Sequence, residues 1–90
     1  MGAKAEISWR SRDAEGSRRE VYARRVGLEW RFFVRAKRFE NWEPLDPVPL
    51  EDWTTLLDAV RRRVGRRLLP PDEEEALRRR IRERFPGVAV

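Results

Sequence analysis

The stretch that decides the fold is EVYARRVGLEWRFFVRAKRFEN, residues 20–41. A two-residue turn at Gly27 and Leu28 folds it into a hairpin, and alternate side chains of each strand then point to opposite faces. One face is apolar, and the other is a basic face with aromatic rings among its charges. The apolar face holds Val21, Ala23, Trp30, Phe32 and Val34. The pairs predicted on the basic face are Tyr22 with Phe33, Glu20 with Arg35, and Arg24 with Arg31.

Residues before this hairpin add a further strand to the sheet. Between residues 4 and 11, Ile7 and Trp9 alternate with polar residues, which is the period-two pattern of a half-buried strand. We expect Ile7 to lie near Ala23 and Trp9 near Val21. Both apolar side chains of this strand then join the apolar face, and the three strands form an antiparallel meander.

The last strand of the meander is expected to run to Asn41. Its alternation changes near the end, where Phe39 and Trp42 fall out of step with the residues before them. A bulge near Arg38 would return both rings to the core. Prolines at positions 44, 47 and 49 then predict an irregular connection and the end of the sheet, because each proline lacks a backbone donor and restricts the residue before it.

Two amphipathic helices are predicted after the prolines. In the first, apolar residues recur at three- and four-residue steps from Leu50 to Val64, with acidic residues in the first turn and arginines in the last. Gly65 and the Pro70–Pro71 pair are expected to end it. The second helix starts at Pro71 with an acidic first turn, and its narrow apolar stripe is Leu77, Ile81 and Phe85.

Together these elements predict one small α+β domain over residues 1–90. A three-stranded antiparallel meander is followed by two C-terminal helices packed on its apolar face, in the order β-β-β-α-α. Loop 12–18 and residues 86–90 are expected to be mobile. A chain of this length buries only about 60 to 65% of its unfolded surface, so a central Trp30 would matter: Trp30→Ala should cost about 3 to 5 kcal/mol.

The charge balance is strongly basic. Charged residues make up 41% of the chain, with 21 Lys+Arg against 16 Asp+Glu and a net charge of +5. All but two of the basic residues are arginine, the side chain best suited to bidentate phosphate contacts and to stacking. This surplus attracts polyanions. Interspersed charges also form ordinary solvated faces, so arginine content alone does not define a function.

The residue types that are missing restrict the chemistry. The chain has no histidine and no cysteine, so it lacks the commonest general base and the thiolate metal ligands. The acidic run 72–75 is explained by a helix start, and Glu40, Glu43 and Asp46 lack a second acidic cluster or a phosphate-binding loop. We therefore expect a protein that is not an enzyme and uses no metal or cofactor. Without an apolar run long enough for a secretion signal or a membrane span, we expect it to be soluble and cytoplasmic, with no membrane partner.

The basic face of the sheet is the candidate binding site. Guanidinium groups suit phosphates and aromatic rings suit unpaired bases, so the predicted acidic partner is RNA or single-stranded DNA. The alternative is a protein interaction or assembly factor, including self-association, that uses the same face or the second helix against an acidic protein. Arginines at 61–67 and 78–84 suggest DNA contacts by a helix pair, but the acidic start of the second helix argues against that reading. The predicted site residues are Tyr22, Arg24, Arg31, Phe33, Arg35 and Lys37.

Overall fold

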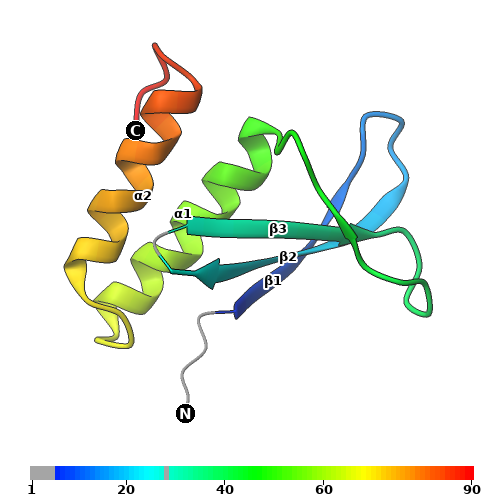
Figure 1. The fold of residues 1–90 in the computed structure, drawn as a ribbon, viewed down its shortest axis with the longest axis horizontal. Coiled ribbons are helices and arrows are strands. Elements are labelled where there is room, and N and C mark those ends of the chain that lie inside the picture. Colours follow the sequence, from blue (N-terminus) through cyan, green and yellow to red (C-terminus); the bar gives the residue numbers. More distant parts are fainter. Residues whose placement is uncertain (1–5, 28) are drawn as a thin grey trace. The chain divides into compact units, whose positions relative to one another are not determined.

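The structure, a computed structural model, describes residues 6–27 and 29–90 and has an α+β fold (Figure 1). The chain forms two compact units, a sheet unit that ends at Pro47 and a helical unit, Val48–Val90. The predicted fold class and the order of strands before helices are confirmed, with one short strand added. Packing of the helices on the apolar face stays a prediction. The elements are β1 (Glu6–Arg12), β2 (Arg18–Val26), β3 (Glu29–Arg35), β4 (Glu43–Pro44), α1 (Leu50–Gly65) and α2 (Pro71–Arg84).

The hairpin of β2 and β3 has the predicted register. Val26 pairs with Glu29, which leaves a two-residue connection in which Gly27 has a φ of 65°. A left-handed residue here matches the twist of the paired strands, and glycine adopts it without a steric penalty. Leu28, the second residue of the predicted turn, lies outside the described residues. The three pairs predicted on the basic face are present, Glu20↔Arg35, Tyr22↔Phe33 and Arg24↔Arg31.

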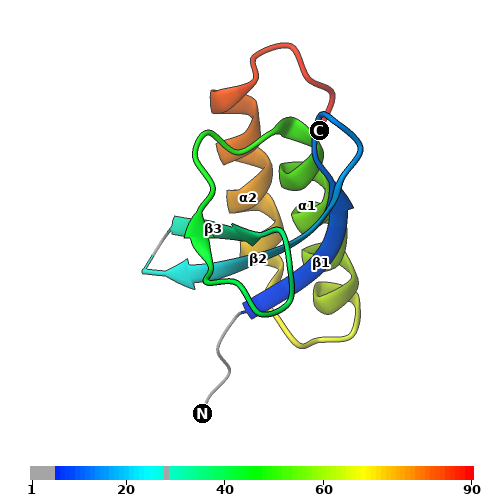
Figure 2. The same ribbon diagram turned by 90° about the vertical axis from the view of Figure 1, so that its right-hand side faces the viewer.

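Strand β1 pairs with β2, and the four strands follow one another in the antiparallel order β1-β2-β3-β4 (Figure 2). Ile7 pairs with Ala23 and Trp9 with Val21, as predicted. The described part of this strand begins at Glu6, so its expected first residues lie outside the described part of the chain. The predicted meander is therefore confirmed and gains a fourth strand.

The loop between β1 and β2 is organised by Asp13. Its carboxylate Oδ1 accepts hydrogen bonds from the backbone N–H groups of Glu15 and Ser17, both at 2.9 Å. The Asp13 carbonyl accepts a further bond from the N–H of Gly16, whose φ is 85°. This is the pattern of a type I turn followed by a left-handed residue, a common three-residue hairpin loop. The mobility expected of this loop stays a prediction.

The apolar face of the sheet has Phe32 at its centre. Phe32 is buried and meets Trp9 edge-to-face, with ring centroids 6.2 Å apart. Trp30 is only half-buried, because it pairs with Arg25 next to the turn, at the end of the hairpin. The cost predicted for Trp30→Ala depended on a central Trp30, and this condition is not met, although the predicted face of Trp30 is correct. The buried residues of this face are Ile7, Val21, Ala23 and Phe32.

The predicted course of the third strand after Arg35 is wrong. Strand β3 ends at Arg35. In the turn that follows, the N–H of Glu40 donates to the carbonyl of Lys37 at 3.0 Å. The chain then reverses into β4. Pro44 lies opposite Phe33 in this two-residue edge strand, where a missing backbone donor is tolerated. A reversal thus replaces the predicted bulge, and the sheet extends as far as Pro44, the first of the three prolines.

This reversal changes the place of both late aromatic residues. Phe39 is not in the core, because it lies on the turn with 95% of its surface exposed. Trp42 is half-buried and lies beside Tyr22, on the basic face. Contacts with other side chains of that face therefore replace the core contacts that were expected for Trp42.

The helical unit is an antiparallel pair, with α1 and α2 side by side in both views (Figures 1 and 2). The predicted helices are confirmed, as is burial of the central residues of both apolar stripes. Asp52 is also buried, at 1% exposure, although the sequence indicated only a first-turn charge that favours the helix dipole. The buried apolar residues of the pair are Trp53, Leu56, Leu57, Val60, Leu77 and Ile81.

Helix α1 ends in a Schellman motif centred on Arg67. The N–H of Leu68 donates to the Arg63 carbonyl at 2.8 Å, and the N–H of Arg67 donates to the Val64 carbonyl at 3.0 Å. Arg67 has a φ of 61°, the left-handed conformation that this position requires and that glycine usually supplies. Gly65 is the last residue of the helix, so the predicted end at Gly65 is confirmed.

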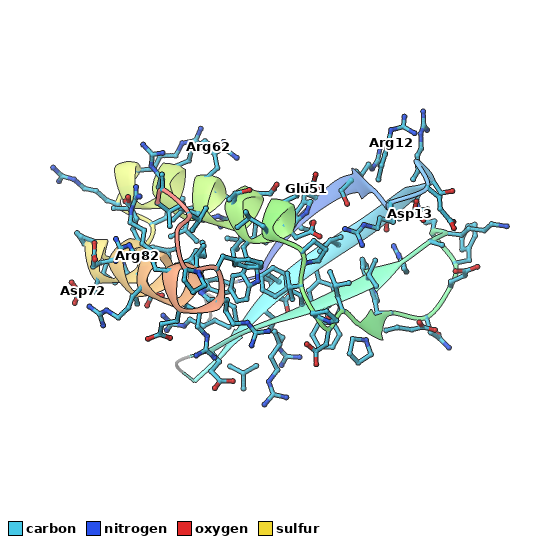
Figure 3. The ribbon with its side chains drawn as sticks, turned by 90° about the horizontal axis from the view of Figure 1, so that it is seen from above. Arg12, Asp13, Glu51, Arg62, Asp72 and Arg82 are labelled. Atoms are coloured by element: carbon cyan, nitrogen blue, oxygen red, sulfur yellow. The ribbon has the colours of Figure 1, made fainter. Side chains whose placement is uncertain are left out.

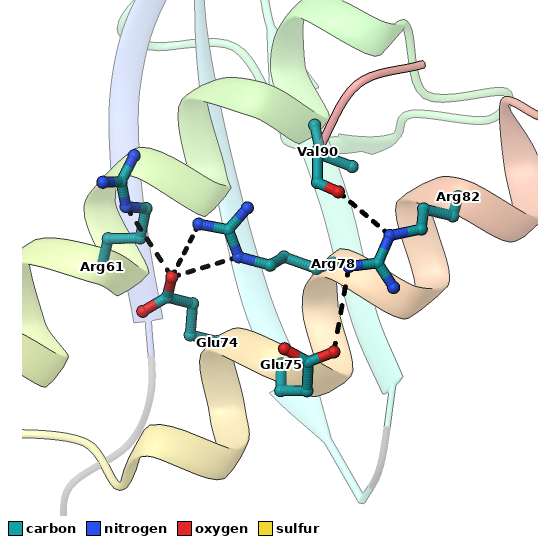
Figure 4. Close-up of polar contacts among 6 residues, drawn as sticks. All are labelled: Arg61, Glu74, Glu75, Arg78, Arg82 and Val90. Atoms are coloured by element: carbon teal, nitrogen blue, oxygen red, sulfur yellow. Dashed lines mark hydrogen bonds and ion pairs between the residues drawn. The ribbon is translucent and has the colours of Figure 1, made fainter. Parts of the chain in front are cut away.

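An ion-pair network links the two helices (Figure 4). Glu74 of α2 accepts a bond from Arg78 at 2.8 Å, and the same oxygen lies 3.7 Å from Nε of Arg61 on α1. Arg82 donates from Nε to the carbonyl oxygen of Val90 at 3.0 Å, so the segment after α2 folds back along the helix. Arg61, Arg78 and Arg82 are thus engaged within the helical unit. The Arg78–Glu74 pair is half-buried, whereas the Arg61 side chain is more than half exposed, so the Arg61–Glu74 ion pair contributes little.

Candidate functional site

The basic face of the sheet carries side chains from all three long strands. It lies opposite the buried residues, and the observed register brings even-numbered residues of β1 and β2 together with odd-numbered residues of β3. Arginines outnumber carboxylates, and an aromatic cluster occupies the middle. The residues of this face are Glu6, Ser8, Arg10, Arg12, Arg18, Glu20, Tyr22, Arg24, Val26, Glu29, Arg31, Phe33 and Arg35, with Trp42 beside them.

The aromatic cluster consists of Tyr22, Phe33 and Trp42. Tyr22 stacks on Phe33 with ring centroids 4.9 Å apart and an interplanar angle of 21°. Trp42 meets Tyr22 edge-to-face at 4.7 Å and 88°. Both geometries are favourable for aromatic pairs. Each ring is half-buried, so the cluster stabilises the sheet and still presents part of its surface.

Arg35 is held in place by two interactions. Its Nε donates to Oε1 of Glu20 at 2.7 Å, and its guanidinium carbon lies 4.3 Å from the centroid of the Trp42 ring. The first contact neutralises the charge locally, and the second is a cation–π arrangement. Arg35 is therefore more ordered and less available to a new anion than the exposed arginines of the same face.

In two places on this face, an arginine of β2 lies directly opposite an arginine of a neighbouring strand. Arg12 pairs with Arg18 at one end of the face, and Arg24 pairs with Arg31 at the other. Like charges at directly opposed positions destabilise a sheet, so both pairs raise the local positive potential at a cost in stability. The six steps from Arg18 to Arg24 span about 20 Å along β2, with the aromatic cluster between the pairs.

Two carboxylates lie beside the Arg24/Arg31 pair, Glu6 opposite Arg24 and Glu29 two residues before Arg31 on the same face. Arg24 lies 4.0 Å from Glu6, and both side chains are about half exposed, which makes this ion pair weak. Arg12 donates to the carbonyl of Gly16 at 2.8 Å, and Figure 3 places its side chain at the β1–β2 loop. Within residues 6–27 and 29–90, Arg18 and Arg31 have no ion-pair partner. Both are exposed and free to meet an anion.

Two shallow hollows lie at the end of the sheet where β2 begins and β3 ends. The first is rich in arginine, with Arg10, Arg12, Arg18 and Arg19 in its lining. The second lies between the β1–β2 loop and the β3–β4 connection, and these two connections are at the same end of the sheet in Figure 1. Its lining residues include Asp13, Arg18, Arg35, Phe39, Glu40, Asn41 and Glu43.

Five of the six predicted site residues lie together on the basic face. Lys37 does not, because β3 has already ended and Lys37 opens the turn that follows. The arginines of β1 and of the start of β2 were not among the predicted site residues. The alternation that assigns Ile7 and Trp9 to the apolar face nevertheless also assigns Arg10 and Arg12 to the basic face. No sequence signal identified Trp42, since its position depends on the reversal after Arg35.

The described residues offer no metal centre and no membrane span. No group of three or more acidic side chains is arranged to hold a metal ion in the described part of the chain. Neither of its helices is long and apolar enough to cross a bilayer. Comparison with protein-family models, curated proteins and solved structures gives no significant match.

Proposed function

We propose that this protein is a non-enzymatic binding module whose basic face binds RNA or single-stranded DNA. The observation that carries the proposal is the position of the two opposed arginine pairs, one on either side of the aromatic cluster. These pairs are Arg12/Arg18 and Arg24/Arg31. A phosphate between two opposed arginines turns a repulsive arrangement into a favourable one. A strand that lies along β2 would then meet phosphate contacts at both ends and rings in the middle.

Arginine and aromatic side chains in this arrangement favour single strands over duplexes. Unpaired bases can stack on exposed ring edges and faces, while a paired base in a duplex cannot reach them. The face is built from strands, and the residues proposed to bind therefore do not belong to a helix that enters a major groove. Affinity is expected to depend mainly on phosphate contacts, with little preference for base sequence.

The direct test compares two double variants of equal net charge. In Arg18→Glu/Arg31→Glu, one member of each opposed pair is reversed. In the control Arg79→Glu/Arg84→Glu, two exposed arginines of α2 are reversed instead. Binding of a short fluorescein-labelled RNA of mixed sequence is followed by anisotropy. We expect the first variant to lose most of its affinity and the control to retain it, and equal losses would refute a role for the basic face.

Salt dependence separates nucleic acid from the alternative partner. For a single strand, the log-log slope of affinity against salt should be about −0.7 per neutralised phosphate, or about −3 if four phosphates are bound. An acidic protein partner is favoured by two observations: Tyr22 already contacts both Phe33 and Trp42, and Arg35 is paired with Glu20. An aromatic-centred protein contact would be far less sensitive to salt.

A further inference from the structure

Phe39 is the most exposed large apolar residue among those described, at 95% exposure. It lies on the tight turn that follows β3, where the Glu40 N–H bonds the Lys37 carbonyl at 3.0 Å. Its neighbours Lys37 and Arg38 are both exposed basic residues. A fully exposed ring that follows two cations in the chain is well placed to stack on a planar group and is poorly placed to support the core.

The ring of Phe39 differs in availability from the aromatic cluster. Tyr22, Phe33 and Trp42 share their ring surfaces with one another and with Arg35. Phe39 has no ring contact or cation–π contact within the described residues. Both faces of its ring are therefore open, which is the requirement for stacking on an unpaired base.

The hollow beside Phe39 supplies the other groups that a nucleotide needs. Arg18 is in its lining and can face a phosphate, and Asn41 offers an amide for the edge of a base. The lining also includes the carboxylates of Asp13, Glu40 and Glu43. That of Asp13 already accepts two backbone N–H groups of its own loop, while Glu40 lies next to Phe39 in the chain. This distribution of charge around the hollow favours an uncharged base near Phe39 and a phosphate near Arg18.

We propose that Phe39 is a base-stacking residue and that this hollow takes one unpaired base of the strand bound on the basic face. The proposal rests on the proposed function and extends it past the end of the sheet. It predicts the path of the bound nucleic acid, which follows β2 toward Arg18 and then reaches the turn that carries Phe39. Stacking energy should depend weakly on salt, because no phosphate is neutralised by the ring.

The test uses Phe39→Ala, Phe39→Leu and Phe39→Trp with the same fluorescein-labelled single-stranded RNA. Removing a stacked ring should weaken binding about 5- to 100-fold. We expect this loss in both Phe39→Ala and Phe39→Leu, with an unchanged salt slope, and retention of affinity in Phe39→Trp. Because Phe39 is exposed, all three should keep the thermal midpoint of the unaltered protein. The control is Leu68→Ala, which removes an exposed apolar side chain of the helical unit.

The outcomes separate this inference from the proposed function. If the unaltered protein binds RNA and Phe39→Ala binds equally well, the stacking role is refuted while the basic face stands. Full affinity in Phe39→Leu would also refute it, since an apolar contact would then suffice. If the unaltered protein does not bind the RNA at low salt, both proposals fall together.

Discussion

Replacing one arginine of each opposed pair by glutamate should stabilise the protein while it abolishes binding. In Arg18→Glu, the new carboxylate lies across from Arg12, and in Arg31→Glu it lies across from Arg24. Each change converts a directly opposed like-charge pair into an opposite-charge pair. Such cross-strand pairs contribute roughly 0.2 to 1 kcal/mol, so the double variant should gain about 1 kcal/mol in its free energy of unfolding.

The assay is thermal and chemical unfolding followed by circular dichroism at low and at high salt. For a domain of this size, about 1 kcal/mol corresponds to a rise of about 4 to 8 °C in Tm. The gain should shrink at high salt, because the Debye length falls to about 3 Å at 1 M. Introducing Arg24→Ala should remove the part of the gain that comes from Arg31→Glu, since the partner is then absent.

A loss of stability in Arg18→Glu/Arg31→Glu at low salt would refute the reasoning. It would mean that the two arginines are not opposed by like charges, or that carboxylates of this face oppose the new ones. A gain that persists unchanged at high salt would also contradict an electrostatic cause. The same preparation serves the binding assay, so loss of RNA affinity with increased stability cannot be attributed to unfolding.

Two further predictions concern the helical unit. Arg67→Gly should stabilise the protein by about 1 kcal/mol, because glycine adopts the left-handed backbone conformation without a steric penalty, whereas Arg67→Ala should give no such gain. Unfolding in guanidinium measures the stability of both variants. Equal effects of the two substitutions would argue against the Schellman geometry. Leu56→Ala should cost about 2 to 5 kcal/mol, because Leu56 is fully buried, while the exposed Leu68→Ala should stay within about 0.5 kcal/mol. Similar costs for the two leucine variants, in the same unfolding assay, would show that the stripe of α1 is not buried.

Most of the sheet could be predicted because one tight turn determines the alternation of both its strands. With Gly27 at the turn, the register of β2 and β3 is fixed, and the register determines on which face of the sheet each side chain lies. The helices were predictable for a similar reason, since stripes such as Leu56, Leu57 and Val60 repeat at the helical period. In each of these cases the pattern is local, so no distant contact was needed to interpret it.

The parts that could not be predicted depend on contacts distant in the sequence. A change of alternation after Arg35 is compatible with a bulge or with a reversal, and only the pairing of β4 with β3 distinguishes them. The positions of Phe39 and Trp42 follow from that choice. The burial of Asp52 was likewise hidden, because a first-turn acid is already explained by the helix dipole. At Arg67, a residue with no preference for the left-handed region occupies the place where glycine was expected.

The central claim is that a single-stranded nucleic acid binds the face of the sheet that carries the two arginine pairs. Amide chemical-shift mapping of the isotope-labelled protein, titrated with single-stranded RNA at low salt, tests it most directly. We predict that the largest shifts fall on β1, β2 and β3 around Arg12, Arg18, Arg24 and Arg31, and on the turn at Phe39. Shifts confined to α1 and α2, or no shifts at all, would contradict it.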